Sequence, residues 1–227
     1  MNCLWCDADI VPDTSWRNII LVSKPKNLCP SCTDQLTVLQ GKRCVKCSRL
    51  SEKEMCPDCM HWERSLSQED PLTWNYSVFS YNEAMKEMIT RWKYRGDYCL
   101  GKAFEMEYRK AFKRNFSFLP KEAVAVPIPL SEERMHERGF NQSKMLASFL
   151  PLKRKDILTR IHGEKQSKKT RRQRVTAVNP FQMKGSINNP VILADDIYTT
   201  GTTLRHAATA LKKHGCPAVY ALTLIRG

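Results

Sequence analysis

Two adjacent acids follow a short apolar run in the last third of the chain. The run is Val191–Ala194, the acids are Asp195 and Asp196, and the loop after them reads Thr-Thr-Gly-Thr-Thr at residues 199–203. Apolar residues then recur at a spacing of three and four over residues 204–211, which indicates one buried face of a helix. The order strand, loop, helix places the acids at the C-terminal end of a strand, where open α/β sheets bind their ligands.

The residue types of this segment suit a phosphorylated sugar. A loop that opens a helix points free backbone N–H groups and the positive end of the helix dipole at an anion. Gly201 lets the backbone approach a phosphate closely, and the four threonines add hydroxyl donors. Carboxylates repel phosphate but accept hydrogen bonds from sugar hydroxyls, so a ribose 5-phosphate satisfies both parts. The alternative is a buried strand with an acidic turn and no ligand. A Walker loop is excluded, because no Gly-Lys-Ser/Thr ends the segment.

Two basic segments could hold further phosphates. The segment Leu130–Gln142 follows an apolar strand predicted at 123–126 and carries Arg134 and Arg138, so it is either a second anion site or a solvated basic loop. Residues 153–174 are the most basic part of the chain and have few apolar positions, which is typical of a mobile loop. This loop could close over bound phosphates, follow a nucleic-acid backbone or simply be solvated. Its candidate side chains are Lys168, Lys169, Arg171, Arg172 and Arg174.

Eight of the ten cysteines lie before residue 60, as four Cys-x-x-Cys pairs. Four thiolates in tetrahedral geometry suit zinc, and two pairs supply four thiolates, so the pairs predict two structural Zn²⁺ sites without an open position for catalysis. Disulfides and a thioredoxin-like redox pair are the alternatives. A cytosolic setting disfavours disulfides, and four repeats without a matching βαβ context disfavour the redox pair. A crossed grouping of the pairs fits the spacing as well as the grouping in chain order. In chain order the sites are Cys3, Cys6, Cys29 and Cys32, and Cys44, Cys47, Cys56 and Cys59.

Charge divides the chain in the same way as the cysteines. Residues 1–70 hold nine Lys and Arg against ten Asp and Glu, whereas residues 71–227 hold 28 against 13, a net charge of +15. Such a surface favours polyanions such as nucleic acid, or an anionic membrane face, although many soluble basic domains bind neither. No stretch has the roughly 20 apolar residues of a membrane span, and no signal peptide is recognisable. We therefore expect a cytoplasmic protein.

The remaining patterns indicate an α/β domain behind a small module. Residues 1–60 have few regularly spaced apolar residues, so a metal is the usual way to stabilise them. Residues 61–73 are polar and contain Pro71, which predicts a linker. Strands are predicted at 74–81 and 218–225. Asn82 can cap a helix whose buried face ends at Trp92. These patterns divide the chain into a zinc-binding module at 1–70 and an α/β domain at 71–227.

The segment 191–203 resembles the signature by which type I phosphoribosyltransferases bind phosphoribosyl pyrophosphate (PRPP). The resemblance implies a phosphoribosyltransferase-like fold, a mostly parallel sheet flanked by helices. It implies that Asp195 and Asp196 hold the ribose 2′- and 3′-hydroxyls, that the following loop holds the 5-phosphate, and that Mg²⁺ binds with the pyrophosphate. On the phosphate side the candidates are Tyr198, Thr199, Thr200, Gly201, Thr202 and Thr203.

Nearly the whole chain resembles the ComF family of late-competence proteins. Besides the PRPP segment, the resemblance lies in the Cys-x-x-Cys series, in Tyr81–Ala84 with Lys93–Asp97, and in Pro127–Leu130 continuing to Arg138–Gln142. The family implies a zinc module joined to a phosphoribosyltransferase-like domain. It also implies a role in DNA uptake during natural transformation, beside a ComFA-type DNA translocase and with DprA-like proteins as partners. Through such partners the protein would lie near the membrane.

Three functions remain open at this point. The first is a competence protein that binds PRPP or a related nucleotide and assists incoming single-stranded DNA. The second is an active phosphoribosyltransferase of nucleobase or nucleotide salvage, in which the acids anchor the ribose while positive charge develops at C1′ and the basic loops stabilise the departing pyrophosphate. The third is a nucleic-acid-binding module that keeps the fold without catalysis. The sequence alone supplies no acceptor and no distinct general base.

Overall fold

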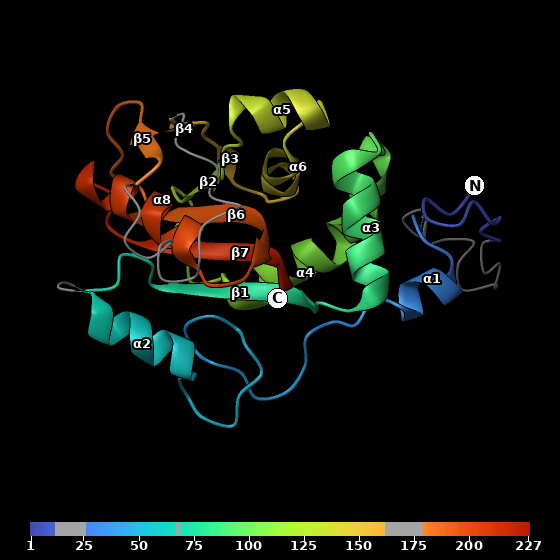
Figure 1. Ribbon diagram of the computed structural model, residues 1–227, viewed down its shortest axis with the longest axis horizontal. Coiled ribbons are helices and arrows are strands. Elements are labelled where there is room, and N and C mark those ends of the chain that lie inside the picture. The colour runs from blue at the N-terminus through green and yellow to red at the C-terminus, as the bar shows by residue number, and fades with distance from the viewer. Residues whose placement is uncertain (12–25, 67–68, 162–178) are drawn as a thin grey trace.

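The computed structural model describes residues 1–11, 26–66, 69–161 and 179–227 (Figure 1). A five-stranded sheet forms its centre, in the order β1-β7-β6-β2-β3, and all four pairings are parallel. Two short strands, β4 and β5, pair antiparallel beside it. The predicted α/β class with a mostly parallel sheet is therefore confirmed. The strands are β1 (Trp74–Ser80), β2 (Val124–Pro127), β3 (Lys153–Arg154), β4 (Leu158–Arg160), β5 (Phe181–Met183), β6 (Val191–Tyr198) and β7 (Val219–Arg226).

Helices cover both faces of the sheet. Successive side chains of a strand point to opposite faces, and both faces here carry apolar side chains that the helices bury. Ile192 and Ala194 of β6 belong to one hydrophobic core with α3, α4 and α6, whereas Val191 and Leu193 belong to a second core with α8. In Figure 1, α5 and α6 lie above the strands, α2 lies below β1, and α3 stands to the right of them. The helical elements are α1 (Pro30–Asp34), α2 (Pro57–Ser65), α3 (Glu83–Tyr94), the 3-10 helix η1 (Tyr98–Phe104), α4 (Glu105–Asn115), α5 (Glu132–Arg138), α6 (Gln142–Ser148) and α8 (Thr202–Lys213).

The cysteine-rich segment contributes to both cores. Three cysteines of the first group pack into the core of α3, α4 and α6, and all four of the second group pack into the core of α8. Between the groups, the chain runs along the outer edge of β1, where Val38 forms an antiparallel bridge with Phe79. The N–H of Leu39 donates to the carbonyl of Val78 at 2.8 Å. The segment therefore covers an edge that would otherwise present unpaired backbone groups.

The predicted linker at 61–73 is wrong over its first five residues. Helix α2 spans Pro57–Ser65 and buries Cys59 and Trp62 on one face. Pro57 stands at the first helical position, where its missing N–H costs nothing. The other residues of α2 within the predicted linker are polar and exposed, which gave the segment the composition of a linker: His61, Glu63, Arg64 and Ser65. The division of the chain at residue 70 stays a prediction.

A buried arginine joins α2, the segment before β1 and the end of β6. Arg205 of α8 is 3% exposed and donates to the carboxylate of Asp70 from Nη2 at 2.8 Å and from Nε at 3.1 Å. Its Nη1 donates to the hydroxyl of Tyr198 at 3.0 Å, and its guanidinium lies 4.6 Å from the ring centre of Trp62. Every donor-bearing nitrogen of this buried charge thus has a partner, as burial requires.

Within the described residues, no helix combines the length and the apolar character that crossing a membrane requires.

We predict that Asp70→Ala lowers the free energy of unfolding by about 3 kcal/mol, because it leaves the Arg205 charge buried without its carboxylate. Urea unfolding of the full chain measures this. Glu52→Ala is the matched control, since Glu52 pairs with Lys42 at the surface, where the two side chains are 87% and 77% exposed. Such exposed pairs contribute little. Equal stability of Asp70→Ala and the control would contradict the role given to the Arg205 pair.

Candidate functional site

The two acids lie within the central strand rather than after it. Strand β6 continues through Asp195 and Asp196 to Tyr198, which pairs with Arg226 of β7. The predicted strand end at Ala194 was therefore too early by four residues. Backbone pairing with β7 extends past the point at which the side chains become polar. The acids still stand near the carboxyl end of a parallel strand with neighbours on both sides, where α/β sheets bind ligands.

Asp195 is held by two hydrogen bonds to the same oxygen. The hydroxyl of Ser143 on α6 donates to its Oδ1 at 3.0 Å, and the backbone N–H of Asp196 donates to Oδ1 at 2.9 Å. Burial, followed by the charge of Asp196, raises the pKa of Asp195 from 3.8 to about 7. This carboxyl therefore exchanges its proton near neutral pH.

Asp196 forms an ion pair with Lys93 at the end of α3, and the two side chains are 15% and 12% exposed. Burial opposes the ionisation of Asp196, but the ammonium of Lys93 and the more distant charge of Arg138 outweigh it and hold the pKa of Asp196 below its ordinary value. The two neighbouring acids consequently differ, since one is a stable anion and the other titrates. Opposite shifts of this kind are typical of functional sites.

The loop after the acids leads directly into α8. Gly201 adopts a left-handed conformation with φ 79°, and the helix begins at Thr202. The N–H of Arg205 donates to the carbonyl of Gly201 at 3.0 Å, so the three amides before Arg205 lie in the first turn, where the helix supplies no acceptor. The hydroxyls of Thr200 and Thr202 lie 2.9 Å apart. First-turn amides and the hydroxyls of Thr200 and Thr202 therefore lie together at the start of α8.

Two residues of the predicted phosphate loop face the interior of the protein. Tyr198 is 2% exposed, its hydroxyl accepts from Nη1 of Arg205, and the guanidinium of Arg226 lies 4.9 Å from the centre of its ring. A Cβ at Gly201 would come closer than 3.0 Å to the Tyr198 hydroxyl and to Nη1 of Arg205. Gly201 is therefore required for packing beneath the loop, in addition to any role in approaching a ligand.

The predicted basic residues fall in three different environments. Arg138 is 9% exposed, and it donates to Oε1 of Gln142 at 3.0 Å and to the Tyr94 hydroxyl at 3.4 Å. Arg134 is exposed on α5. The remaining candidates, Lys168, Lys169, Arg171, Arg172 and Arg174, lie outside the described residues.

Buried polar atoms without a partner lie beside the acids. Among the described residues, Nε of Arg138 and Nε2 of Gln142 have no hydrogen-bond partner, although both atoms are shielded from solvent. The charge of Arg138 also contributes to lowering the pKa of Asp196. This corner of the site can therefore donate to an anion without first breaking an internal bond.

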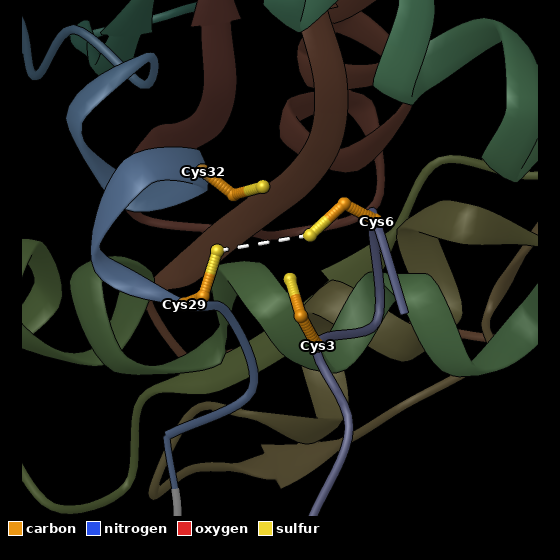
Figure 2. A group of neighbouring side chains, drawn as sticks. All are labelled: Cys3, Cys6, Cys29 and Cys32. Carbon is orange, nitrogen blue, oxygen red and sulfur yellow. Dashed lines mark hydrogen bonds between the residues drawn. The ribbon is translucent and has the colours of Figure 1, made fainter. Parts of the chain in front are cut away.

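The eight predicted metal ligands form two compact groups in chain order, and the crossed grouping does not occur. Within each group the four Sγ atoms lie within 4.8 Å of one another. Figure 2 shows Cys3, Cys6, Cys29 and Cys32 pointing toward a common centre, with Sγ of Cys6 and Cys29 3.7 Å apart. In the second group, Sγ of Cys47 and Cys56 are 3.6 Å apart.

These distances fit a metal better than a disulfide. A tetrahedral zinc ion with Zn–S bonds of about 2.3 Å separates its sulfurs by about 3.8 Å. A disulfide bond would be about 2.05 Å long. Both groups could therefore hold a metal ion as they stand.

Three side chains of the site were missed by the sequence reasoning. Lys93 directly follows the buried face of α3, and Ser143 follows the Asn141 that caps α6, so both read as ordinary helix-end residues. Arg160 at the end of β4 was counted only as part of a basic segment. Burial, and then the nearby charge of Arg134, lowers the pKa of Arg160, which places two cations together near Asp195. Only the Lys93–Asp97 stretch offered a signal, as part of the family resemblance.

The chain is similar to several characterised proteins. It is 39% identical over 228 residues to competence protein ComFC of Bacillus subtilis, covering 99% of this chain and 94% of that protein. It is 29% identical to competence protein ComFC of Streptococcus pneumoniae over the full length of both chains. It is 28% identical to DNA utilization protein YhgH of Escherichia coli, covering 88% of this chain and 96% of that protein. No protein-family model matches.

Among solved structures, a hypoxanthine phosphoribosyltransferase from Staphylococcus aureus is similar at 17% identity and a TM-score of 0.29, covering 63% of this chain and 64% of that chain. A TM-score this low does not establish a common fold, so the α/β class rests on the strand order itself.

We predict that stability falls as pH rises from about 4 to about 7, and that Asp195→Asn abolishes much of this dependence. The folded-state pKa of Asp195, about 7, lies above its ordinary value of 3.8, so within this range the folded protein keeps a proton that the unfolded chain has released. The loss is on the order of a few kcal/mol. Urea unfolding between pH 4 and pH 8 measures it.

Asp156→Asn is the control for this measurement, because Asp156 pairs with Lys144 and Arg154 at the surface. It should leave the pH dependence of the wild-type protein unchanged. The same slope in Asp195→Asn and in the wild-type protein would argue against burial of a protonated Asp195.

Proposed function

This chain belongs to the ComFC family of competence proteins, and on that basis we propose that it acts in competence-associated DNA uptake by binding PRPP at the carboxyl end of β6. The observation that carries the proposal is the meeting of two unlike acids with the amide-rich start of α8. Asp196 is anionic and held by Lys93, Asp195 is held by Ser143, and the loop 199–203 adjoins them. A ribose 5-phosphate carries both groups that these residues suit, hydroxyls for the acids and a phosphate for the loop.

In this proposal the acids and the loop divide the sugar phosphate between them. Asp196 accepts hydrogen bonds from one ribose hydroxyl. Asp195, whose pKa is about 7, accepts from the other and can also donate when protonated. The free amides of the first turn of α8 and the hydroxyls of Thr200 and Thr202 bind the 5-phosphate. A helix N-terminus is favourable for this group because its dipole is positive there.

The pyrophosphate end of PRPP would meet the basic side of the site. Arg134, Arg138 and Arg160 supply positive charge near the acids, and Arg138 carries a buried N–H without a partner among the described residues. The basic segment with Lys168, Lys169, Arg171, Arg172 and Arg174 would add to it. Mg²⁺ usually binds with substrate phosphates and keeps several waters, so it would neutralise the pyrophosphate without a dedicated protein cage.

Catalysis is a second candidate, favoured by the opposite pKa shifts of Asp195 and Asp196. In a phosphoribosyltransferase these acids would anchor the ribose while positive charge develops at C1′, and the arginines would stabilise the departing pyrophosphate. The acceptor would be a nucleobase or a related amine. Release of pyrophosphate with one free base, among several offered with PRPP and Mg²⁺, distinguishes an enzyme from a protein that only binds PRPP.

We also propose that the protein binds single-stranded DNA through the basic part of the chain. Residues 71–227 carry a net charge of +15, and contacts between lysine or arginine and phosphate give salt-dependent affinity. A cytoplasmic location beside a ComFA-type translocase and DprA-like proteins accords with this activity. The name of the Escherichia coli relative, a DNA utilization protein, lends it further support.

We further propose that each four-cysteine group holds one structural Zn²⁺ ion. The sulfur distances of 3.7 and 3.6 Å match a tetrahedral four-thiolate site. Four protein ligands leave no position for substrate. The ions would therefore stabilise the cysteine-rich segment, which contributes side chains to both cores, rather than take part in chemistry.

We predict that Asp195→Ala combined with Asp196→Ala abolishes PRPP binding, measured by calorimetry with PRPP and Mg²⁺, and leaves affinity for single-stranded DNA unchanged. Glu52→Ala combined with Glu54→Ala is the control, since it removes two exposed acids of the cysteine-rich segment. Neutralising Lys168, Lys169, Arg171 and Arg172 should instead weaken DNA binding and flatten its salt dependence. Retention of PRPP binding by the double aspartate variant would refute the site.

We predict that the purified protein contains two equivalents of zinc and that Cys44→Ser combined with Cys47→Ser reduces this to one. Metal release by a thiol-modifying reagent, followed with a colorimetric chelator, measures the content. Cys99→Ser should retain both ions, because Cys99 is exposed and belongs to neither group. Full zinc content in the Cys44 and Cys47 variant would exclude the second site.

A further inference from the structure

Three consecutive carbonyls of the phosphate loop are held by side chains from beneath it. Nη1 of Arg226 donates to the carbonyls of Tyr198 at 3.1 Å and Thr199 at 3.2 Å. Nε1 of Trp62 donates to the carbonyl of Thr200 at 2.8 Å. These bonds hold the backbone just before Gly201, where the loop turns into α8.

Both of these side chains adjoin the second cysteine group. Nη2 of Arg226 lies 3.6 Å from Sγ of Cys47. Trp62 lies on α2, the helix that follows Cys56 directly and carries Cys59 one turn before the tryptophan. A single guanidinium, 6% exposed, therefore contacts a candidate metal ligand with one nitrogen and the phosphate loop with another.

Because Arg226 is positively charged, its contact with Sγ of Cys47 should strengthen when the second cysteine group binds a metal. Four thiolates around a divalent cation carry a net negative charge, and N–H donors to the sulfurs stabilise such a site. Among the described residues, Nη1 of Arg226 also contacts the main-chain oxygen of Gly227, and the buried Nε has no hydrogen-bond partner. A metal-loaded thiolate group would supply negative charge beside this buried cation and would help to hold it in place.

The first cysteine group provides a contrast within the same chain. It packs into the opposite core, and in the described part of the chain no hydrogen bond joins it to residues 198–203. Its neighbour Arg91 instead donates to the carbonyl of Trp5 at 3.0 Å and pairs with Asp97. An effect of metal on the phosphate loop should therefore arise from the second group alone.

We propose that Arg226 is a positioning residue that couples the metal in the second cysteine group to the shape of the phosphate loop. When the group holds its ion, Arg226 orders the carbonyls of Tyr198 and Thr199, and the amides that follow are fixed for the 5-phosphate. Loss of the ion releases Arg226 and loosens the loop. The inference rests on the proposed function in naming PRPP as the ligand, but the coupling of metal to loop is separate from it.

The test compares Arg226→Met with the wild-type full-length, zinc-loaded protein. We expect amide hydrogen exchange over residues 199–204 to rise about tenfold, and the zinc affinity of the second group to fall about tenfold, the lower end of the effect usual for groups that contact metal ligands. PRPP binding should weaken by a similar factor. The Cys44→Ser and Cys47→Ser variant should reproduce the increase in exchange.

Two further variants control this comparison. Arg43→Met removes another arginine of the cysteine-rich segment, one that stacks on Tyr76 and donates to the carbonyl of Leu39, and it should leave the loop unchanged. Arg226→Lys keeps the charge but cannot reach Cys47 and both carbonyls together, so it should give an intermediate effect. If Arg226→Met fails to fold, hydrogen exchange over residues 199–204 in Arg226→Lys tests the coupling instead.

Unchanged exchange over 199–204 in a folded Arg226 variant, or after removal of the second zinc ion, would overturn the coupling. An equal effect of metal loss from the first group would overturn it as well. If the wild-type protein does not bind PRPP, the proposed function fails, while hydrogen exchange and zinc affinity still decide whether the metal orders the loop.

Discussion

Two carboxylates side by side near the end of a central strand cannot both be buried as free anions, and the surrounding structure is arranged around this constraint. Lys93 in the last turn of α3 pairs with Asp196, and Ser143 in the first turn of α6 donates to Asp195. One acid is stabilised as an anion, and the other holds its proton to about pH 7. Like charges at close range separate the pKa values of a pair in this way. The same separation gives the site one group that only accepts hydrogen bonds and one that can also donate.

Buried arginines connect parts of the chain that are distant in sequence. Arg205 joins Asp70, Trp62 and Tyr198, and Arg226 joins Cys47 to the backbone after β6. Burying a guanidinium is costly unless nearly all of its donors are used, so each arginine restricts the positions of several segments at once. The cysteine-rich segment is consequently attached directly beneath the phosphate loop. This attachment is the physical basis for expecting metal and ligand binding to influence each other.

The two cysteine groups pack into the cores on opposite faces of the sheet. A segment with so few apolar residues cannot form a core of its own. Its cysteines instead enter the two existing cores, one group on each face, and the chain between them covers the edge of β1. The segment therefore packs directly against the strands and helices of residues 71–227. Its helix α2, with a polar outer surface, illustrates this, because its two buried residues are the cysteine and the tryptophan that contact the rest of the protein.

Residue types at short spacing were enough to predict the local features of this protein. The Cys-x-x-Cys pairs, the run of Val191–Ala194 into Asp195 and Asp196, and the helix after Gly201 all follow from residue types at short spacing, which is where sequence patterns are informative. Which distant residues complete the site depends instead on how the elements pack together. Lys93 and Ser143 read as ordinary helix-end residues, and Trp62 lay in an apparent linker, yet its bond to Thr200 spans 138 residues. The contact of Arg226 with Cys47 spans 179 residues. Such partners are brought together by strand order and core packing, and a local pattern carries no information about them.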